Sequence, residues 1–283
     1  MIDVTPSPIA FSIGPLSIGW YGLAYAVGLA VTYLVIAHEA RWRRLDVSLL
    51  PNAMIVVAVA ALIGGRLYHV IDQWQLYRDD LLRVVLPPYS GLGVYGGIIA
   101  GTLTAVLYAR WKRQPVLIWA DAVAPGLFVM QAIARWGNFF NQELYGAPTT
   151  LPWGIAIQCI HRTQGYPCPP GSDPLATLGQ HFHPMFLYES LSGALGALAL
   201  IWLSRRFAER LRPGDLLLIF FIWYGIVRFA VESLKANDWV FFGIPTAQII
   251  AAATVIVAAV ALVVRHRRPV GVGPPEGVAD ARG

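Results

Sequence analysis

The stretch IPTAQIIAAATVIVAAVALVV, residues 244–264, decides the fold class because its 21 residues include no charged side chain. About 20 apolar residues in a helix are enough to cross the hydrocarbon core of a bilayer. Basic side chains begin directly afterwards, at Arg265, Arg267 and Arg268. An apolar segment followed by a basic cluster is typical of a membrane-spanning helix that ends at the cytoplasmic surface. We therefore expect an integral membrane protein.

The rest of the chain has the same character. Of its 283 residues, 57% are hydrophobic and only 13% are charged. The mean hydropathy of +0.57 exceeds what the core of a soluble domain requires. Backbone polar groups in lipid must be bonded within their own segment, which favours helices. Seven segments qualify: 18–37, 53–71, 91–109, 116–134, 184–203, 216–234 and 244–264. The sequence therefore predicts an all-α, polytopic membrane protein with seven transmembrane helices.

The lysines and arginines predict the orientation of these helices. Thirteen of the 21 lie in four clusters: Arg41, Arg43 and Arg44; Arg110, Lys112 and Arg113; Arg205, Arg206, Arg210 and Arg212; Arg265, Arg267 and Arg268. Each cluster follows an odd-numbered segment, and short loops rich in these residues stay in the cytoplasm. We therefore expect the N-terminus outside and the C-terminus inside. No basic residue precedes the first segment, so we expect that segment to be retained rather than cleaved as a signal peptide.

One long connection and one short tail complete the expected organisation. Residues 136–182 join the fourth and fifth segments on the outer side, which predicts an extracytoplasmic cap on a seven-helix membrane domain covering 1–268. Residues 269–283 are rich in Gly, Pro and Val, which predicts a disordered cytoplasmic tail. Cys159 and Cys168 both fall in the cap and can pair if it lies outside the cell. Two cysteines cannot form a four-ligand zinc site.

The formal net charge of +5 does not indicate a nucleic-acid partner. The basic residues lie in short clusters between apolar segments rather than on one polar face, and membrane orientation explains that arrangement. We expect membrane lipids as partners, with no nucleic acid and no metal.

Three arginines interrupt otherwise apolar segments. Arg66, Arg135 and Arg228 lie within or at the outer ends of their helices, where an ionised side chain is costly unless it is paired or used. Together they predict an anion-binding site. Tyr224 and Glu232 share a helix face with Arg228 because the spacing is four. Two interpretations are open: Glu232 and Arg228 only neutralise each other, or Glu232 holds the guanidinium in place for an anionic ligand.

The stretch RWGNFFNQELYG, residues 135–146, has the highest density of polar residues and glycine near the membrane. It contains the side chains Asn138, Asn141 and Glu143, and Gly146 allows the backbone to approach another group closely. The stretch is interpreted either as a capped helix end or as part of the binding site.

Other small and aromatic residues have structural interpretations. Gly93, Gly97 and Gly101 are spaced by four, which indicates close packing between helices. Tyr21 and Tyr25 share a face of the first segment near the outer interface, where aromatic rings commonly act as anchors.

The chain resembles the prolipoprotein diacylglyceryl transferase family along nearly its whole length. The most diagnostic motif of that family is Gly-Arg-x-Gly-Asn-Phe-x-Asn-x-Glu-x-x-Gly, and residues 134–146 match it except that Ala134 replaces the first Gly. Shorter motifs agree in the same order: Trp20-Tyr21-Gly22, Gly64-Gly65-Arg66, Asp121 with Ala124-Pro125, His183-Pro184 with Tyr188-Glu189, and Tyr224-Gly225 with Arg228 and Glu232. The resemblance implies a bacterial inner-membrane enzyme. Its substrates would be phosphatidylglycerol and the lipobox cysteine thiol of prolipoproteins.

The implied reaction forms a thioether and releases glycerol phosphate, and no cofactor is expected because the phosphodiester carries its own leaving group. We assign Arg135 and Arg228 to the phosphate, since planar guanidinium donors match phosphate oxygens. The other residues expected to bind substrate are Tyr21, Arg66, Asn138, Asn141, Gly146, Tyr224 and Glu232. Within that set, Glu232 is expected to orient an arginine, and the role of Arg66 is expected to be mainly structural.

The sequence leaves open which group removes the thiol proton. Many members of the family have a histidine where this chain has Tyr95, and a tyrosine with an ordinary pKa of about 10 is a poor base near neutrality. Tyr95 is then expected to position the headgroup or the peptide. Glu143 is a candidate base, with orientation of the arginines as the alternative role. His183 is another candidate, with a capping or structural role as the alternative.

Other classes of function also place arginines in a helical bundle. A transporter or channel would move an anionic solute without changing any lipid. For a structural envelope protein, removing the arginines would lower only the amount of protein in the cell. A transferase or hydrolase that uses the same lipid with another acceptor is the enzymatic alternative.

Overall fold

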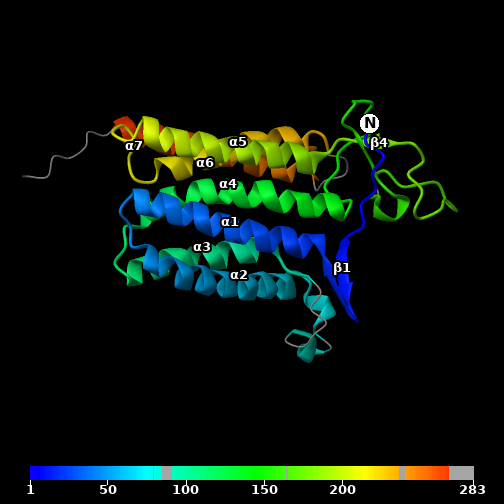
Figure 1. Cartoon of the computed structure of the whole chain (residues 1–283), viewed down its shortest axis with the longest axis horizontal. Helices are drawn as coiled ribbons and strands as arrows, with labels where there is room; N and C mark the ends of the chain where they lie inside the picture. The colour runs from blue at the N-terminus through cyan, green and yellow to red at the C-terminus, as the bar shows by residue number, and fades with distance from the viewer. Residues whose placement is uncertain (79, 85–90, 164, 236–239, 268–283) are drawn as a thin grey trace, which may run out of the picture.

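The computed structural model describes residues 1–78, 80–84, 91–163, 165–235 and 240–267. The tail expected to be disordered, 269–283, lies outside these residues. The described residues contain seven long helices: α1 (Trp20–Trp42), α2 (Leu50–Asp72), α3 (Val94–Trp111), α4 (Val116–Phe140), α5 (Met185–Arg206), α6 (Asp215–Glu232) and α7 (Thr246–Arg267). The helices lie side by side, and the short strands gather beyond the end of the bundle at which α1 begins (Figure 1).

Five of these helices are long and apolar enough to cross a membrane. They are α1, α4, α5, α7 and α2 taken with the turn before it, Val47–Asp72. The chain is thus a mostly helical, multi-pass membrane protein. Helices α3 and α6 contain 18 residues each, which corresponds to about 27 Å of helix. Helix α6 also carries three charged side chains, so hydropathy alone does not identify it as a span.

The helix ends differ from the predicted ones where apolar residues form short strands. Strand β2 (Leu16–Gly19) pairs with β1 (Ile9–Ile13) and takes up the start of the first predicted segment. Strand β6 (Ile244–Pro245) pairs with β5 (Val240–Phe241) and takes up the start of the last one. A short apolar run is compatible with either a strand or a helix, so hydropathy could not locate these boundaries.

The helices form three groups across the bundle. Helices α1 and α4 pack against each other in the middle, α2 packs against α3 on one side, and α5, α6 and α7 lie on the other side (Figure 1). An apolar cluster joins the middle group to the last one. Phe128 of α4, which is 1% exposed, packs there with Leu200 of α5 and with Leu216 and Phe220 of α6.

Glycines allow α2 and α3 to approach closely, as their spacing predicted. A methyl group added at Gly64 would lie 2.6 Å from the carbonyl oxygen of Gly96, and one at Gly97 would lie 3.2 Å from the carbonyl oxygen of Ala61. At Gly101, the added methyl group would be 3.4 Å from the side chain of Ala61. Larger side chains at Gly64 or Gly96 would therefore push the two backbones apart.

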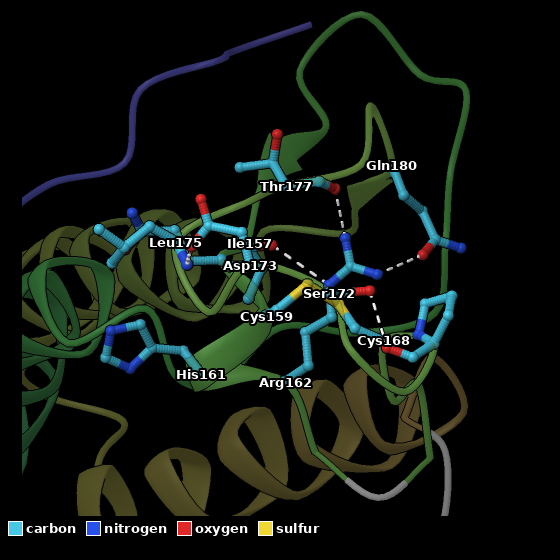
Figure 2. The surroundings of a disulfide bond; sticks show 12 residues. Ile157, Cys159, His161, Arg162, Cys168, Ser172, Asp173, Leu175, Thr177 and Gln180 are labelled. Carbon is cyan, nitrogen blue, oxygen red and sulfur yellow. Dashed lines mark hydrogen bonds between the residues drawn. A yellow bond between two sulfur atoms is a disulfide. The ribbon is translucent and has the colours of Figure 1, made fainter.

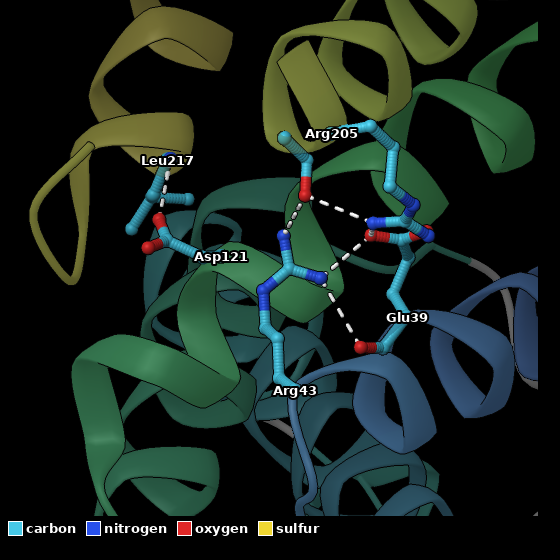
Figure 3. Close-up of polar contacts among 6 residues, drawn as sticks. Glu39, Arg43, Asp121, Arg205 and Leu217 are labelled. Atoms are coloured by element: carbon cyan, nitrogen blue, oxygen red, sulfur yellow. Dashed lines mark hydrogen bonds and ion pairs between the residues drawn. The ribbon is translucent and has the colours of Figure 1, made fainter. Parts of the chain in front are cut away.

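A buried carboxylate ties α1 to α5 at the end of the bundle where α1 finishes. Glu39, which is 0% exposed, lies 2.6 Å from Nη1 of Arg43 and 2.5 Å from Nη2 of Arg205. Arg43 also donates to the hydroxyl of Ser204 at 2.8 Å (Figure 3). Nearby, Asp121 of α4 accepts hydrogen bonds from two backbone amides at the start of α6. Two arginines predicted only to mark the cytoplasmic side thus also hold helices together.

The connection between α4 and α5, which we call the cap, is held together by a short sheet, a disulfide and hydrogen bonds. Strand β3 (Ile155–Ala156) pairs with β4 (His181–Phe182), and Cys159 forms a disulfide with Cys168. Arg162 donates to the side chain of Gln180 at 2.8 Å and to two backbone carbonyls, which ties neighbouring loops together (Figure 2). The possible pairing of the two cysteines is therefore found in the structure.

We predict that Glu39→Gln destabilises the protein strongly. Without the carboxylate, the guanidinium groups of Arg43 and Arg205 face each other with no neutralising charge, and breaking a buried ion pair in this way costs about 3–5 kcal/mol. Denaturant unfolding of the detergent-solubilised protein measures the change. Glu209→Gln, an exposed carboxylate near the same end, is the control. A loss for Glu39→Gln no larger than that of the control would contradict this account.

Candidate active site

A second buried carboxylate joins α4, α5 and α6 near the cap. Glu189, in the second turn of α5, is 2% exposed. Its Oε2 pairs with Nε of Arg135 at the end of α4, and its Oε1 lies 3.5 Å from Nη1 of Arg228 on α6. One carboxylate therefore holds two arginines that are far apart in the sequence.

Glu232 completes this group from α6. Its Oε2 lies 2.6 Å from Nη2 of Arg228, one helical turn away, so the buried pair expected from the spacing of four is present. The side chains of Arg135 and Arg228 remain 25% and 23% exposed, whereas the two glutamates are nearly inaccessible. The accessible side of the cluster is therefore cationic.

Lys235 adds positive charge beside the cluster. It follows the end of α6, and its pKa is lowered below the ordinary value by burial and then by the charge of Arg228, with Arg135 adding to the effect and Glu189 opposing it. Burial is the main cause of the lowered pKa, and the positive charges of Arg228 and Arg135 add to it. Such an environment favours an anionic ligand.

The polar stretch after Arg135 forms a chain of hydrogen bonds. Asn138 donates to Glu143 at 2.7 Å, Asn141 donates to the same oxygen at 3.4 Å, and Arg135 donates to Asn138 at 3.5 Å. The backbone can turn back on itself here because Gln142 adopts a positive φ of 52°. Glu143 is therefore linked to Arg135 through Asn138.

The glycines of the same stretch bring backbone close to other elements. A methyl group at Gly137 would lie 3.0 Å from the ring of Tyr21, whose hydroxyl donates to that of Tyr25 at 3.1 Å. A methyl group at Gly146 would lie 2.7 Å from the carbonyl oxygen of Leu234. Gly146 therefore lets the cap sit directly on the end of α6, beside the residues that precede Lys235.

Four of the sequence-predicted residues have other neighbours. Tyr224 stacks on Phe220 in the apolar cluster, with ring centres 5.9 Å apart, and Tyr95 is 57% exposed on α3. Arg66 donates to backbone carbonyls of the loop after α2, including that of Arg83 at 2.6 Å. His183 lies with Nδ1 3.1 Å from the hydroxyl of Tyr188.

The central residue of the cluster, Glu189, was not among the predicted site residues. It appeared only as part of the motif Tyr188-Glu189. A signal was present in the sequence, because a carboxylate near the outer end of an apolar segment needs a cationic partner just as an arginine needs an anionic one. The pairing itself depends on how α4, α5 and α6 pack.

A family model described as prolipoprotein diacylglyceryl transferase matches residues 8–264. The chain belongs to the prolipoprotein diacylglyceryl transferase family. The matched residues include α4, α5 and α6, the helices that carry Arg135, Glu189 and Arg228.

Curated relatives of this transferase family support the assignment. The chain is 38% identical over 246 residues to a protein of Bifidobacterium longum strain NCC 2705, covering 82% of this chain and 76% of that protein. It is 34% identical over 288 residues to one of Chloroflexus aggregans, covering 94% and 92% respectively. It is 32% identical over 276 residues to one of Listeria innocua serovar 6a, covering 98% and 95%. All three relatives are named phosphatidylglycerol–prolipoprotein diacylglyceryl transferase.

We predict that Glu189→Gln lowers the rate of diacylglyceryl transfer about 100-fold. The neutral amide no longer holds both arginines, and misplacing a positioning group by about 1 Å costs that much. Transfer to a peptide acceptor measures the rate. Glu209→Gln, which makes the same change at an exposed glutamate at the opposite end of the bundle, is the control. A rate for Glu189→Gln within a few-fold of the control would argue against this positioning role.

We also predict a pH-dependent stability change for Lys235→Met. Because the pKa of Lys235 is lowered in the folded protein, protonated lysine opposes folding at neutral pH, and stability rises as pH approaches the ordinary value of 10.5. The variant removes this penalty, so it should unfold at a higher temperature than the wild type at pH 7, by a margin that shrinks towards pH 10. Lys112→Met, at the other end of the bundle, corrects for the loss of a lysine as such. A constant margin between pH 7 and 10 would be inconsistent with the assignment.

Proposed function

We propose that this chain transfers the diacylglyceryl group of phosphatidylglycerol to the lipobox cysteine thiol of prolipoproteins, the first step of bacterial lipoprotein maturation. Membership of the transferase family supports this activity. The observation that carries the proposal is the pair of partly exposed guanidinium groups, Arg135 and Arg228, held on either side of the buried Glu189.

The reaction breaks one bond and forms another at a single carbon. The cysteine sulfur attacks the glycerol carbon that bears the phosphate, and a carbon–sulfur bond forms. The carbon–oxygen bond breaks, and its electron pair leaves with the phosphate oxygen of glycerol phosphate. Negative charge therefore grows on the phosphate as the reaction proceeds, and fixed donors aimed at it stabilise the transition state more than the ground state.

Arg135 and Arg228 supply these donors. Each guanidinium has several N–H groups in one plane, and the contacts with Glu189 and Glu232 use only some of them. The carboxylates also fix the directions in which the remaining donors point. This arrangement avoids the need to order two long side chains when the lipid binds.

The same positive charge helps to form the nucleophile. A free cysteine has a pKa of about 8.5, and neighbouring cations lower it because they stabilise the thiolate. Arg135, Arg228 and Lys235 together provide that environment for the thiol of the incoming prolipoprotein. The thiol proton then passes more easily to solvent or to a nearby acceptor. Glu143 and His183 remain the candidate acceptors from the sequence.

We further propose that all seven helices cross the bacterial inner membrane, with the cap and the ion-pair cluster at the outer side. The described residues of the four basic clusters, which exclude Arg268, lie at the turns and ends opposite the cap, and this supports the cytoplasmic side for that end. The disulfide in the cap supports an oxidising compartment for that end. The short helices α3 and α6 fit a bilayer because packing against longer neighbours and local thinning accommodate a small mismatch.

A direct assay tests the activity. Purified protein is mixed with phosphatidylglycerol and a peptide that contains a lipobox cysteine, and the mass of the peptide is measured. We expect a gain of one diacylglyceryl group with phosphatidylglycerol and no gain with phosphatidylcholine. An unchanged peptide mass, or a change that persists when the cysteine is replaced by serine, would contradict the proposal.

We predict that Arg228→Lys retains charge but loses about 100-fold in turnover. A lysine ammonium is a compact charge and cannot reproduce the planar donor pair, and one lost transition-state donor typically costs at least this much. The peptide assay measures turnover, and Arg206→Lys at the opposite end of the bundle is the matched control. Near-normal turnover in Arg228→Lys would exclude a bidentate phosphate contact.

A further inference from the structure

Two turns at the end of the bundle opposite the cap share a sequence and a conformation. Helix α1 ends at the third residue of ARWRR, residues 40–44, and α3 ends at the third residue of ARWKR, residues 109–113. The fifth residue of each, Arg44 and Arg113, has a positive φ, 56° and 53° respectively. The amide after each of these arginines bonds back to the alanine that opens its motif, at 2.9 Å and 2.8 Å. The resemblance therefore includes the backbone.

Arginine is an unusual choice at this position. The residue that follows a helix in the left-handed region is most often glycine, because a side chain there is strained. Both turns nevertheless have an arginine, and both arginines are exposed, as are Arg41 and Arg110. Arg43, in contrast, is used internally by Glu39. Four accessible cations thus lie on two matching turns.

An apolar cavity of about 210 Å³ lies beside these turns. Helices α1 to α4 all contribute to its wall, with side chains that include Ile36, Val57, Ala105 and Trp119. Gln114, which directly follows Arg113, also lines the cavity. The α2–α3 hairpin and the α1–α4 pair contact each other only sparsely, so the cavity lies where two packed units meet without filling the space between them.

We propose that an anionic phospholipid binds here, with part of one acyl chain in the cavity and its phosphate on the arginines of the two turns. A cavity lined by apolar side chains suits an acyl chain, and basic pockets between helices on the cytoplasmic side are typical sites for anionic headgroups. The tryptophan of each turn, Trp42 and Trp111, is exposed, and exposed aromatic rings are common where a membrane protein meets lipid headgroups. This lipid is bound at the end of the bundle remote from Arg135 and Arg228, so it fills a structural site and is not the lipid that reacts.

The leaflet in which this lipid resides follows from the proposed orientation, but the site itself does not depend on that proposal. It also does not depend on transferase activity. The lipid would join the α2–α3 hairpin to the rest of the bundle through contacts that the protein alone does not supply.

A local fluorescent probe tests the site. Both native cysteines are in the disulfide, so Leu49→Cys, at the mouth of the cavity, can be labelled selectively with bimane. The labelled protein is placed in phosphatidylcholine nanodiscs, and phosphatidylglycerol or phosphatidylcholine with brominated acyl chains is added. We expect phosphatidylglycerol to quench the probe at a mole fraction at least 5-fold lower than phosphatidylcholine, since each cation near a headgroup contributes roughly that factor.

Two sets of variants separate charge from cavity. Arg44→Gln with Arg113→Gln should remove the preference for phosphatidylglycerol, whereas the control pair Arg206→Gln with Arg210→Gln, with the same change of charge near the same surface, should retain it. Ala105→Phe, which fills the cavity, should reduce quenching by both lipids. Equal quenching by the two lipids in the unsubstituted labelled protein, or equal effects of the two arginine pairs, would overturn the proposal.

Discussion

Burial of the Glu189 carboxylate between Arg135 and Arg228 is the interaction on which the site depends. A carboxylate in an apolar bundle is costly unless cations neutralise it, and here the cations come from two other helices. The pairing fixes the relative positions of α4, α5 and α6 at the cap end. It also leaves the outer parts of both guanidinium groups accessible, which is what an anion-binding site requires.

The opposite end of the bundle uses the same kind of contact for a different purpose. Glu39 is enclosed by Arg43 and Arg205, which ties α1 to α5 (Figure 3). Asp215 lies 2.6 Å from His266, which ties α6 to α7. Exposure does not separate the two clusters, because the side chain of Arg205 is 29% exposed, compared with 25% for Arg135 and 23% for Arg228. The arginines at the cap end differ in that they belong to the motifs shared with the transferase family.

Much of the architecture was predictable, because a bilayer imposes one simple constraint on length and hydropathy. The helical segments and the close α2–α3 contact at Gly97 and Gly101 followed from local pattern. The boundaries at β2 and β6 did not, since short apolar runs form strands as readily as helix ends. Tyr224 and Glu232 were both predicted from one helix face, yet only Glu232 contacts Arg228 in the described structure, while Tyr224 stacks in the apolar cluster.

The sequence by itself determined that this is a helical membrane protein with costly arginines near one surface, and that its motifs are those of a diacylglyceryl transferase family. Those features depend on composition and spacing along the chain. Only the tertiary structure decided which charges meet. Arg135 is 54 positions from Glu189 and 93 positions from Arg228 in the sequence. The three residues come together because α4, α5 and α6 pack side by side. Helix packing selects partners by shape, and no local pattern encodes that choice.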